Sequence, residues 1–168
     1  MIASLGRSGI KAVRRPVVAI VSTGNELLQP GEKYTAGKIY NSNAYSIAAM
    51  VTKYGGIPRV KGIAKDTVES LEAALDGALT ADLVVTSAGV SKGDYDVVKD
   101  VLASKGEIAL WSVRMRPAKP LAFGLLDRKD GTRVPHLGLP GNPVSAMVAF
   151  EQFGRPAMRL MMGKPQVE

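Results

Sequence analysis

The stretch Val17-Val18-Ala19-Ile20-Val21, which runs on into Thr23-Gly24-Asn25, decides the fold class of this chain. An unbroken run of apolar, mostly β-branched residues is typical of a strand that is covered on both faces. Residues 82–86 repeat the pattern and lead into a loop of small residues, 87–93. Strands of this kind belong to parallel sheets with helices on each side, so the two stretches predict an α/β fold.

Helical and strand patterns alternate outward from these two strands. Apolar residues recur at helical spacing in 47–54, 68–79 and 97–102, and further strands are expected at 57–63, 107–115, 121–126 and 133–139. Such alternation is typical of βαβ units, and it predicts a mainly parallel sheet with helices on both sides.

Several residues predict where helices begin or bend. Asp66, with Glu69 three positions later, resembles a capping box at the start of one helix. Asn142 followed by Pro143 predicts the N-cap and first turn of the last helix. Gly154 and Pro156 are expected to kink or divide that helix.

Length and charge limit the domain organisation. The chain has 168 residues, which is enough for one domain of ordinary size. Its net charge is +7, and residues 1–15 hold +4 of it, since they carry three arginines, one lysine and no acid. Residues 1–15 are expected to be a linker or the remnant of a preceding domain, and residues 16–168 to be the domain itself.

Composition excludes several function classes. The chain has no cysteine, which excludes disulfides and thiolate metal sites, and its single histidine, His136, is expected to be structural. The remaining +3 on residues 16–168 fits a local anion site better than a nucleic-acid interface, which needs a broad positive face. No apolar run approaches the length of a membrane span, and no secretory signal is present, so we expect a cytoplasmic protein.

Glycine-marked loops follow three of the predicted strands, and each is also consistent with a plain strand-to-helix turn. The carboxyl ends of parallel strands share one sheet edge, so the loops are expected to converge there. Backbone N–H groups at such ends favour anions, and we therefore expect a phosphate or oxyanion site. The loops are Thr23-Gly24-Asn25-Glu26, 87–93 and Pro140-Gly141-Asn142.

Acidic residues accompany these loops. Glu26 follows the first strand, Asp66 the second, and Asp94 and Asp96 the loop at 87–93. Carboxylate oxygens on a chain without cysteine suit Mg²⁺, although Asp66 is at least equally expected to be only an N-cap, and Asp94 and Asp96 to be first-turn acids.

Basic and hydroxyl side chains complete the candidate site. Arg114 and Arg116 would share one face of a strand, near Lys119, and they could clamp an oxyanion or line a solvated sheet edge. Ser145 lies in the first turn of the last helix without an evident base, so we expect an anion-binding hydroxyl rather than a nucleophile.

Five ordered motifs across residues 16–163 together resemble molybdopterin molybdenumtransferases of the MoeA, or gephyrin E-domain, type. Each motif alone is weak, but their order is specific. They are Val21-Ser22-Thr23-Gly24-Asn25-Glu26-Leu27, Ile39-Tyr40-Asn41-Ser42-Asn43, the stretch from Ser87 to Asp96, the stretch from Met115 to Gly124, and Gly138-Leu139-Pro140-Gly141-Asn142-Pro143-Val144-Ser145.

The resemblance implies a three-layer α/β/α molybdopterin-binding domain. It implies insertion of molybdate into adenylylated molybdopterin with loss of AMP, in a homo-oligomer, with Mg²⁺ as the cofactor. By this resemblance Glu26, Asp66 and Asp96 are active-site acids, with Asp96 and Glu26 on the metal. The substrate-binding positions that it implies are Thr23, Gly24, Ser87, Gly89, Ser91, Arg116, Lys119, Pro120, Pro140, Gly141, Asn142 and Ser145.

The resemblance also leaves alternatives. The family's enzymes are larger than this chain, and a second chain completes their active site. A molybdopterin adenylyltransferase of the same fold and a non-catalytic pterin-binding or oligomerisation module therefore remain open. Ala88 and Ala118 stand where the family has glycine, which predicts loops that hold the ligand less closely.

Overall fold

A six-stranded sheet forms the centre of the computed structural model, which describes residues 1–87 and 95–164, without the side chains of residues 95 and 96. Its strand order is β4-β1-β5-β8-β7-β6. The strands are β1 (Val17–Thr23), β4 (Ile57–Ala64), β5 (Leu83–Ser87), β6 (Gly106–Ser112), β7 (Pro120–Asp127) and β8 (Arg133–Leu139). Neighbours among β4, β1, β5 and β8 pair in parallel, whereas β7 runs antiparallel to both β6 and β8. The prediction of a mainly parallel sheet is confirmed.

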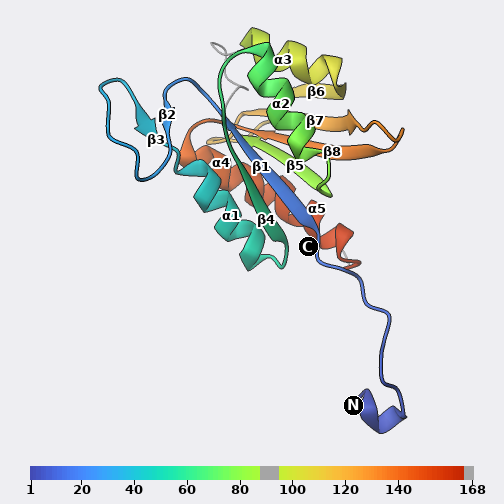
Figure 1. Ribbon diagram of the computed structural model, residues 1–168. Coiled ribbons are helices and arrows are strands. Elements are labelled where there is room, and N and C mark those ends of the chain that lie inside the picture. The colour runs from blue at the N-terminus through green and yellow to red at the C-terminus, as the bar shows by residue number, and fades with distance from the viewer. Residues whose placement is uncertain (88–94, 165–168) are drawn as a thin grey trace.

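Helices cover both faces of this sheet, which confirms three α/β/α layers (Figure 1). Two helices, α2 (Val68–Ala78) and α3 (Tyr95–Ser104), pack on one face. The other face carries α1 (Asn43–Lys53), α4 (Pro143–Ala149) and α5 (Arg155–Met161). Alternate residues of β1 enter the two apolar clusters, Ile20 on the α1 side and Val21 on the α2 side. This explains why β1 has no polar face.

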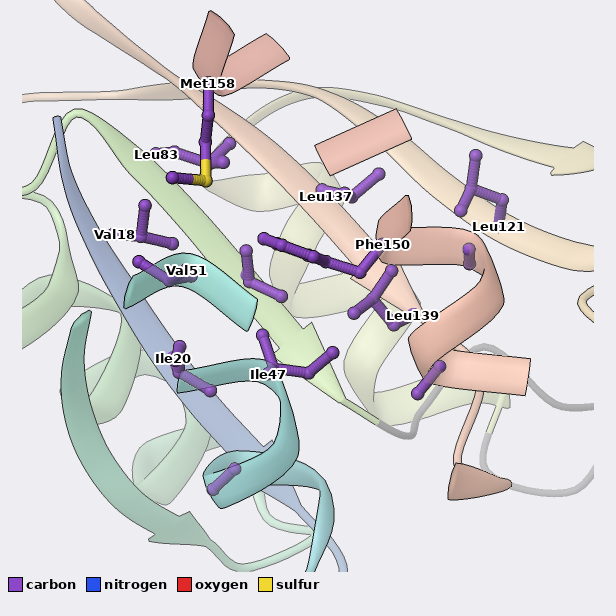
Figure 2. Close-up of a cluster of buried hydrophobic side chains, with 14 of the residues drawn as sticks. Val18, Ile20, Ile47, Val51, Leu83, Leu121, Leu137, Leu139, Phe150 and Met158 are labelled. Atoms are coloured by element: carbon purple, nitrogen blue, oxygen red, sulfur yellow. The ribbon is translucent and has the colours of Figure 1, made fainter. Parts of the chain in front are cut away.

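Phe150 is the largest fully buried side chain of the α1 side, where it lies near Leu137 and Leu139 (Figure 2). It begins a π-helical turn, Phe150–Gly154, which joins α4 to α5. A Cβ atom on Gly154 would lie 2.5 Å from the Phe150 ring, so only glycine lets the ring pack there. The expected division of the last helix is confirmed, and it takes the form of this π-helical turn.

An excursion at residues 24–40 projects from the body between β1 and α1 (Figure 1). Its two short strands, β2 (Leu27–Leu28) and β3 (Ile39–Tyr40), pair in parallel. Before β1, residues 1–13 extend away from the body, and Arg14 and Arg15 contact it through Asp82 and the carbonyls of Gly55 and Gly56. Within the described residues, every helix is too short or too polar to cross a bilayer.

Candidate functional site

One edge of the sheet gathers the predicted loops. Since β1, β4, β5 and β8 are parallel, their carboxyl ends at Thr23, Ala64, Ser87 and Leu139 lie at the same edge. The reversed strand β7 then returns the β6–β7 connection, residues 113–119, to that edge as well. The sheet thus brings together the predicted loops at 23–26, 87 and 140–142 with the basic segment. Gly89 and Ser91 lie outside the described residues.

Glu26 and Asp66 follow the carboxyl ends of the neighbouring strands β1 and β4. Glu26 folds back over Gly24, where an added Cβ would lie only 2.4 Å from a carboxylate oxygen. Asn25 joins this turn to Asp66: its backbone N–H donates to Asp66 Oδ2 at 2.9 Å, and its own Oδ1 accepts from the Asp66 N–H at 3.3 Å. The Lys38 ammonium donates a hydrogen bond to the Asn25 carbonyl.

The prediction that Asp66 caps α2 is wrong. Thr67 is the N-cap, because its Oγ1 accepts the Ser70 N–H at 3.3 Å. Asp66 lies one residue earlier and uses one carboxylate oxygen on Asn25. The capping task is therefore performed by its neighbour, and Asp66 is oriented toward the Glu26 turn.

A cavity of about 550 Å³ opens beside these acids. It lies between the 24–40 excursion and the end of β4, and its walls include Asn25, Gln29, Lys38 and Lys65. A larger cavity of about 810 Å³ lies at the opposite ends of the strands, away from all the predicted loops. There Arg14 hydrogen-bonds Asp82 and holds the pKa of that carboxyl below its usual range. We therefore assign the site to the smaller cavity's edge.

The basic segment does not have the predicted form. The prediction placed Arg114 and Arg116 on one face of a strand through residue 115, whereas β6 ends at Ser112. Residues 113–119 form a loop closed by a hydrogen bond from Val113 N–H to the Lys119 carbonyl, 2.8 Å long. The apolar alternation that suggested a strand arises because Val113 and Met115 pack against the α1-side cluster.

This loop presents unpaired cations. Arg114, Arg116 and Lys119 are exposed, and their side chains make no hydrogen bond or ion pair with any described residue. Ala118, at φ 75°, is the one non-glycine residue of the described chain in the left-handed region, a conformation that glycine adopts without strain. Pro120 follows as the first residue of β7. The segment therefore holds positive charge in a constrained loop.

The turn after β8 agrees with its prediction. Asn142 is the N-cap of α4, since its Oδ1 accepts the Ser145 N–H at 3.2 Å, and Pro143 occupies the first turn. Ser145 Oγ lies 3.5 Å from the same oxygen. Pro140 is buried, while Gly141 is half-buried with its carbonyl bound by Asn43.

The predicted metal site is only partly described. Asp96 lies in the first turn of α3, and its side chain is outside the description. No cluster of three or more potential metal ligands occurs among the described side chains. Glu26 and Asp66 nevertheless follow the carboxyl ends of the neighbouring strands β1 and β4, and their carboxylate oxygens are the donor type that Mg²⁺ prefers, so the residues present fit this ion.

His136 adds no charge to the site. It is fully buried in β8, and its Nε2 lies 3.0 Å from Thr86 Oγ1. Burial lowers its pKa to about 3, because the protein interior disfavours the charged ring. The ring is therefore neutral at physiological pH, in agreement with a structural role.

Sequence reasoning missed a buried polar network behind the site. Ser22, Asn41 and Ser87 are each at most 1% exposed and hydrogen-bond in a chain. The polar pair Ser22-Thr23 at the end of an otherwise apolar strand is the sequence signal that could have indicated it.

Residues 19–160 match the family model described as "Probable molybdopterin binding domain". The chain belongs to this family. As a molybdopterin-binding domain it is 42% identical to the molybdopterin molybdenumtransferase of Nostoc sp. over 156 residues, which are 92% of this chain and 35% of that protein. The corresponding protein of Haemophilus influenzae is 36% identical over 99% of the chain and 40% of its own length.

Solved structures agree with the family assignment. The domain superimposes on the molybdopterin biosynthesis moea protein of Pyrococcus horikoshii with a TM-score of 0.82 at 31% identity, covering 97% of this chain and 39% of that one. The tungsten cofactor synthesizing protein MoaB of Pyrococcus furiosus shares the fold alone, with a TM-score of 0.67 at 15% identity. The chain thus spans about two fifths of its molybdenumtransferase relatives.

Proposed function

We propose that this chain is the molybdopterin-binding domain of a molybdopterin molybdenumtransferase. It would hold adenylylated molybdopterin and molybdate at the carboxyl edge of its sheet. The observation that carries the proposal is the return of the unpaired cations at 113–119 to the edge that already holds Glu26, Asp66 and the turn at 140–142. Identity of 36–42% to proteins named for this reaction supports it.

The substrate's charges suggest how the residues divide the binding. Molybdate is an oxyanion, so Arg116 and Lys119 are assigned to it, with Pro120 shaping the loop and Ser145 donating its hydroxyl. The pterin phosphate is assigned to the turns at the strand ends, where glycine permits close approach of the backbone. Those positions are Thr23, Gly24, Ser87, Gly89, Ser91, Pro140, Gly141 and Asn142.

The acids are assigned to the adenylate end of the substrate. Asp96 and Glu26 would hold Mg²⁺, and Asp66 would orient the ligands of the metal or accept a proton. When bound, the metal would neutralise charge on the adenylate phosphate as that group is attacked. Asn25 and Lys38 hold the Glu26–Asp66 corner in place through their contacts with Asp66 and with each other.

Calorimetry tests the binding claim. The 168-residue chain is titrated with adenylylated molybdopterin, with and without Mg²⁺. We expect weak binding that Mg²⁺ strengthens, and poor molybdenum transfer, because contacts from other domains and a second chain are lacking. Absence of heat in both conditions contradicts the proposal.

The metal role of Asp96 has a separate test. In the complete enzyme, Asp96→Asn should slow metal-dependent cleavage of the adenylate at least tenfold, since an amide binds Mg²⁺ weakly. AMP release, followed by chromatography at several Mg²⁺ concentrations, measures the effect. Unchanged turnover at limiting Mg²⁺ would remove Asp96 from this role.

Two alternatives predict different results in the same assays. An adenylyltransferase would form adenylylated molybdopterin from ATP and molybdopterin, a step that our proposal does not include. A non-catalytic module would bind the pterin compound with the same affinity whether or not Mg²⁺ and molybdate are present.

The proposal also covers the cellular compartment, the assembly state and the partners of the protein. We infer a cytoplasmic homo-oligomer, without nucleic-acid or membrane partners. Support for assembly comes from an apolar groove of about 670 Å³ beside β6, β7 and α5, whose walls include Trp111, Phe123 and Leu160. Light scattering across a concentration series tests the oligomer, and a constant monomer mass would contradict it.

A further inference from the structure

A chain of buried hydrogen bonds joins three segments of the site. Ser87 Oγ donates to Ser22 Oγ at 3.1 Å, and Ser22 Oγ donates to Asn41 Oδ1 at 3.1 Å. The same Asn41 oxygen accepts the Ala44 N–H at 3.3 Å. The chain therefore ties the ends of β1 and β5 to the first turn of α1.

A second asparagine ties in the turn after β8. Asn43 Nδ2 donates to the Gly141 carbonyl at 2.8 Å, across 98 residues of sequence. Asn41 and Asn43 are only two residues apart, so the start of α1 holds both the end of β5 and the 140–142 turn. No other described element contacts both segments through side-chain hydrogen bonds.

The orientation of each amide follows from its partners. Asn41 must turn its oxygen toward the Ala44 N–H, which can only donate, and Asn43 must turn its nitrogen toward the Gly141 carbonyl, which can only accept. Asn41 Nδ2 and Asn43 Oδ1 are then left buried without a partner among the described residues. Burying half-satisfied amides costs stability, a cost that apolar side chains at these two positions would avoid.

We infer that Asn41 and Asn43 are positioning residues that fix Ser87 and Gly141 relative to one another. This inference rests on the proposed function, in which both segments line the ligand. Neither asparagine touches the ligand. Each acts through a segment that does, because a loop held by a buried hydrogen bond loses less freedom when the ligand binds.

Two measurements on the 168-residue chain test the inference. Backbone amide exchange at residues 85–87 and 141–146 reports how firmly the two segments are held. Calorimetry with adenylylated molybdopterin reports affinity. The variants are Asn41→Ala and Asn43→Ala, and Thr52→Ala is the control, because Thr52 lies in the same helix and its hydroxyl bonds only the Ala48 carbonyl.

We expect Asn41→Ala to raise amide exchange near residue 87 about tenfold, and Asn43→Ala to do so at 141–146. Each should weaken binding roughly tenfold, while Thr52→Ala changes neither quantity. Asn41→Asp keeps an oxygen acceptor for both donors, so it should recover most of the affinity. A merely structural role would lower stability without this segment-specific pattern or the recovery.

Two outcomes overturn the inference. One is a folded Asn41→Ala or Asn43→Ala chain with unchanged exchange in its own segment. The other is binding within twofold of the unaltered chain. If the unaltered chain does not bind, the proposed function fails, and amide exchange alone then decides the positioning claim. If Asn41→Ala does not fold, Ser22→Ala breaks the same link with a smaller change and is read by the same criteria.

Discussion

Single residues at this site are defined by what surrounds them more than by their type. His136 would titrate near neutral pH in water, yet full burial beside Thr86 lowers its pKa to about 3. Asp66 is a residue type that often caps helices, yet its neighbour Thr67 is the N-cap of α2. Both cases show that burial and a partner decide the role.

The buried histidine makes stability depend on pH. The unfolded chain takes up a proton on His136 near pH 6.5, whereas the folded chain does not until about pH 3. Stability is therefore full above pH 6.5 and falls as the pH drops below it. Between pH 7 and pH 5 we expect the free energy of unfolding to decrease by about 2 kcal/mol from this group.

Urea titrations at both pH values measure this decrease. His136→Gln removes the titrating ring and keeps a polar partner for Thr86, so the variant should show a clearly smaller difference between the two conditions. An equal pH dependence in both proteins would mean that the ring is protonated in the fold or that other groups dominate.

At the scale of secondary-structure elements, the loop between β6 and β7 contributes most to the candidate site, because it carries the unpaired cations. Arg116 and Lys119 are unpaired there among the described residues, so removing either leaves the fold's ion pairs intact. We expect Arg116→Ala or Lys119→Ala to weaken oxyanion-dependent binding about tenfold, since charge-assisted hydrogen bonds are lost. The free energy of unfolding should change little.

The matched control for this loop is Arg59→Ala. Arg59 is exposed on β4, away from the loop, so its substitution removes the same charge without touching the loop. Calorimetry at two salt concentrations separates the local effect from a general one. Equal losses for Arg59→Ala and Arg116→Ala would show that overall charge, and no specific contact, attracts the anion.

The start of α2 carries a prediction about folding alone. Thr67→Ala removes the acceptor of the Ser70 N–H and should lower the free energy of unfolding by about 1 kcal/mol. Thr67→Ser should keep most of it. Asp66→Asn retains an oxygen for the Asn25 N–H, so thermal unfolding should show almost no change. A larger loss for Asp66→Asn would show that the Asp66 carboxylate charge itself stabilises the fold, since Asn and Asp cap helices about equally well.

At the scale of the whole molecule, one side of the sheet is incompletely covered. The single tryptophan, Trp111, is 59% exposed in the apolar groove beside α5. We expect the fluorescence of a dilute monomer to be red-shifted and readily quenched by acrylamide. Assembly through this face should shift the emission to the blue as protein concentration rises. Emission independent of concentration, together with a growing mass, would place the interface elsewhere.

How much could be predicted from sequence depends on how local each signal is. The runs at 17–21 and 82–86 fixed the central strands, because burial on both faces leaves an unbroken apolar pattern. The prediction of a strand through residue 115 was wrong. Val113 and Met115 lie in a loop, but their side chains pack against the core as those of strand residues would. Local pattern reports burial and does not report the hydrogen bonds that define a strand.

Within the site, too, local features could be predicted from the sequence and long-range contacts could not. Asn142 and Pro143 could be predicted as a helix start from their residue types alone, and this prediction is confirmed. The Ser22–Asn41–Ser87 network could not be predicted, because its bonds join residues 19 and 65 positions apart. The functional roles of Glu26 and Asp96 stay predictions.

The reversal of β7 bears on how such domains diversify. A parallel crossover needs a dozen or more residues and usually a helix, whereas an antiparallel return can be very short. Because the cations arrive on an antiparallel return, their segment can be lengthened, shortened or exchanged without rebuilding a layer. Chemical preference for one oxyanion over another is then cheapest to alter in these few residues, while the scaffold beneath them stays the same.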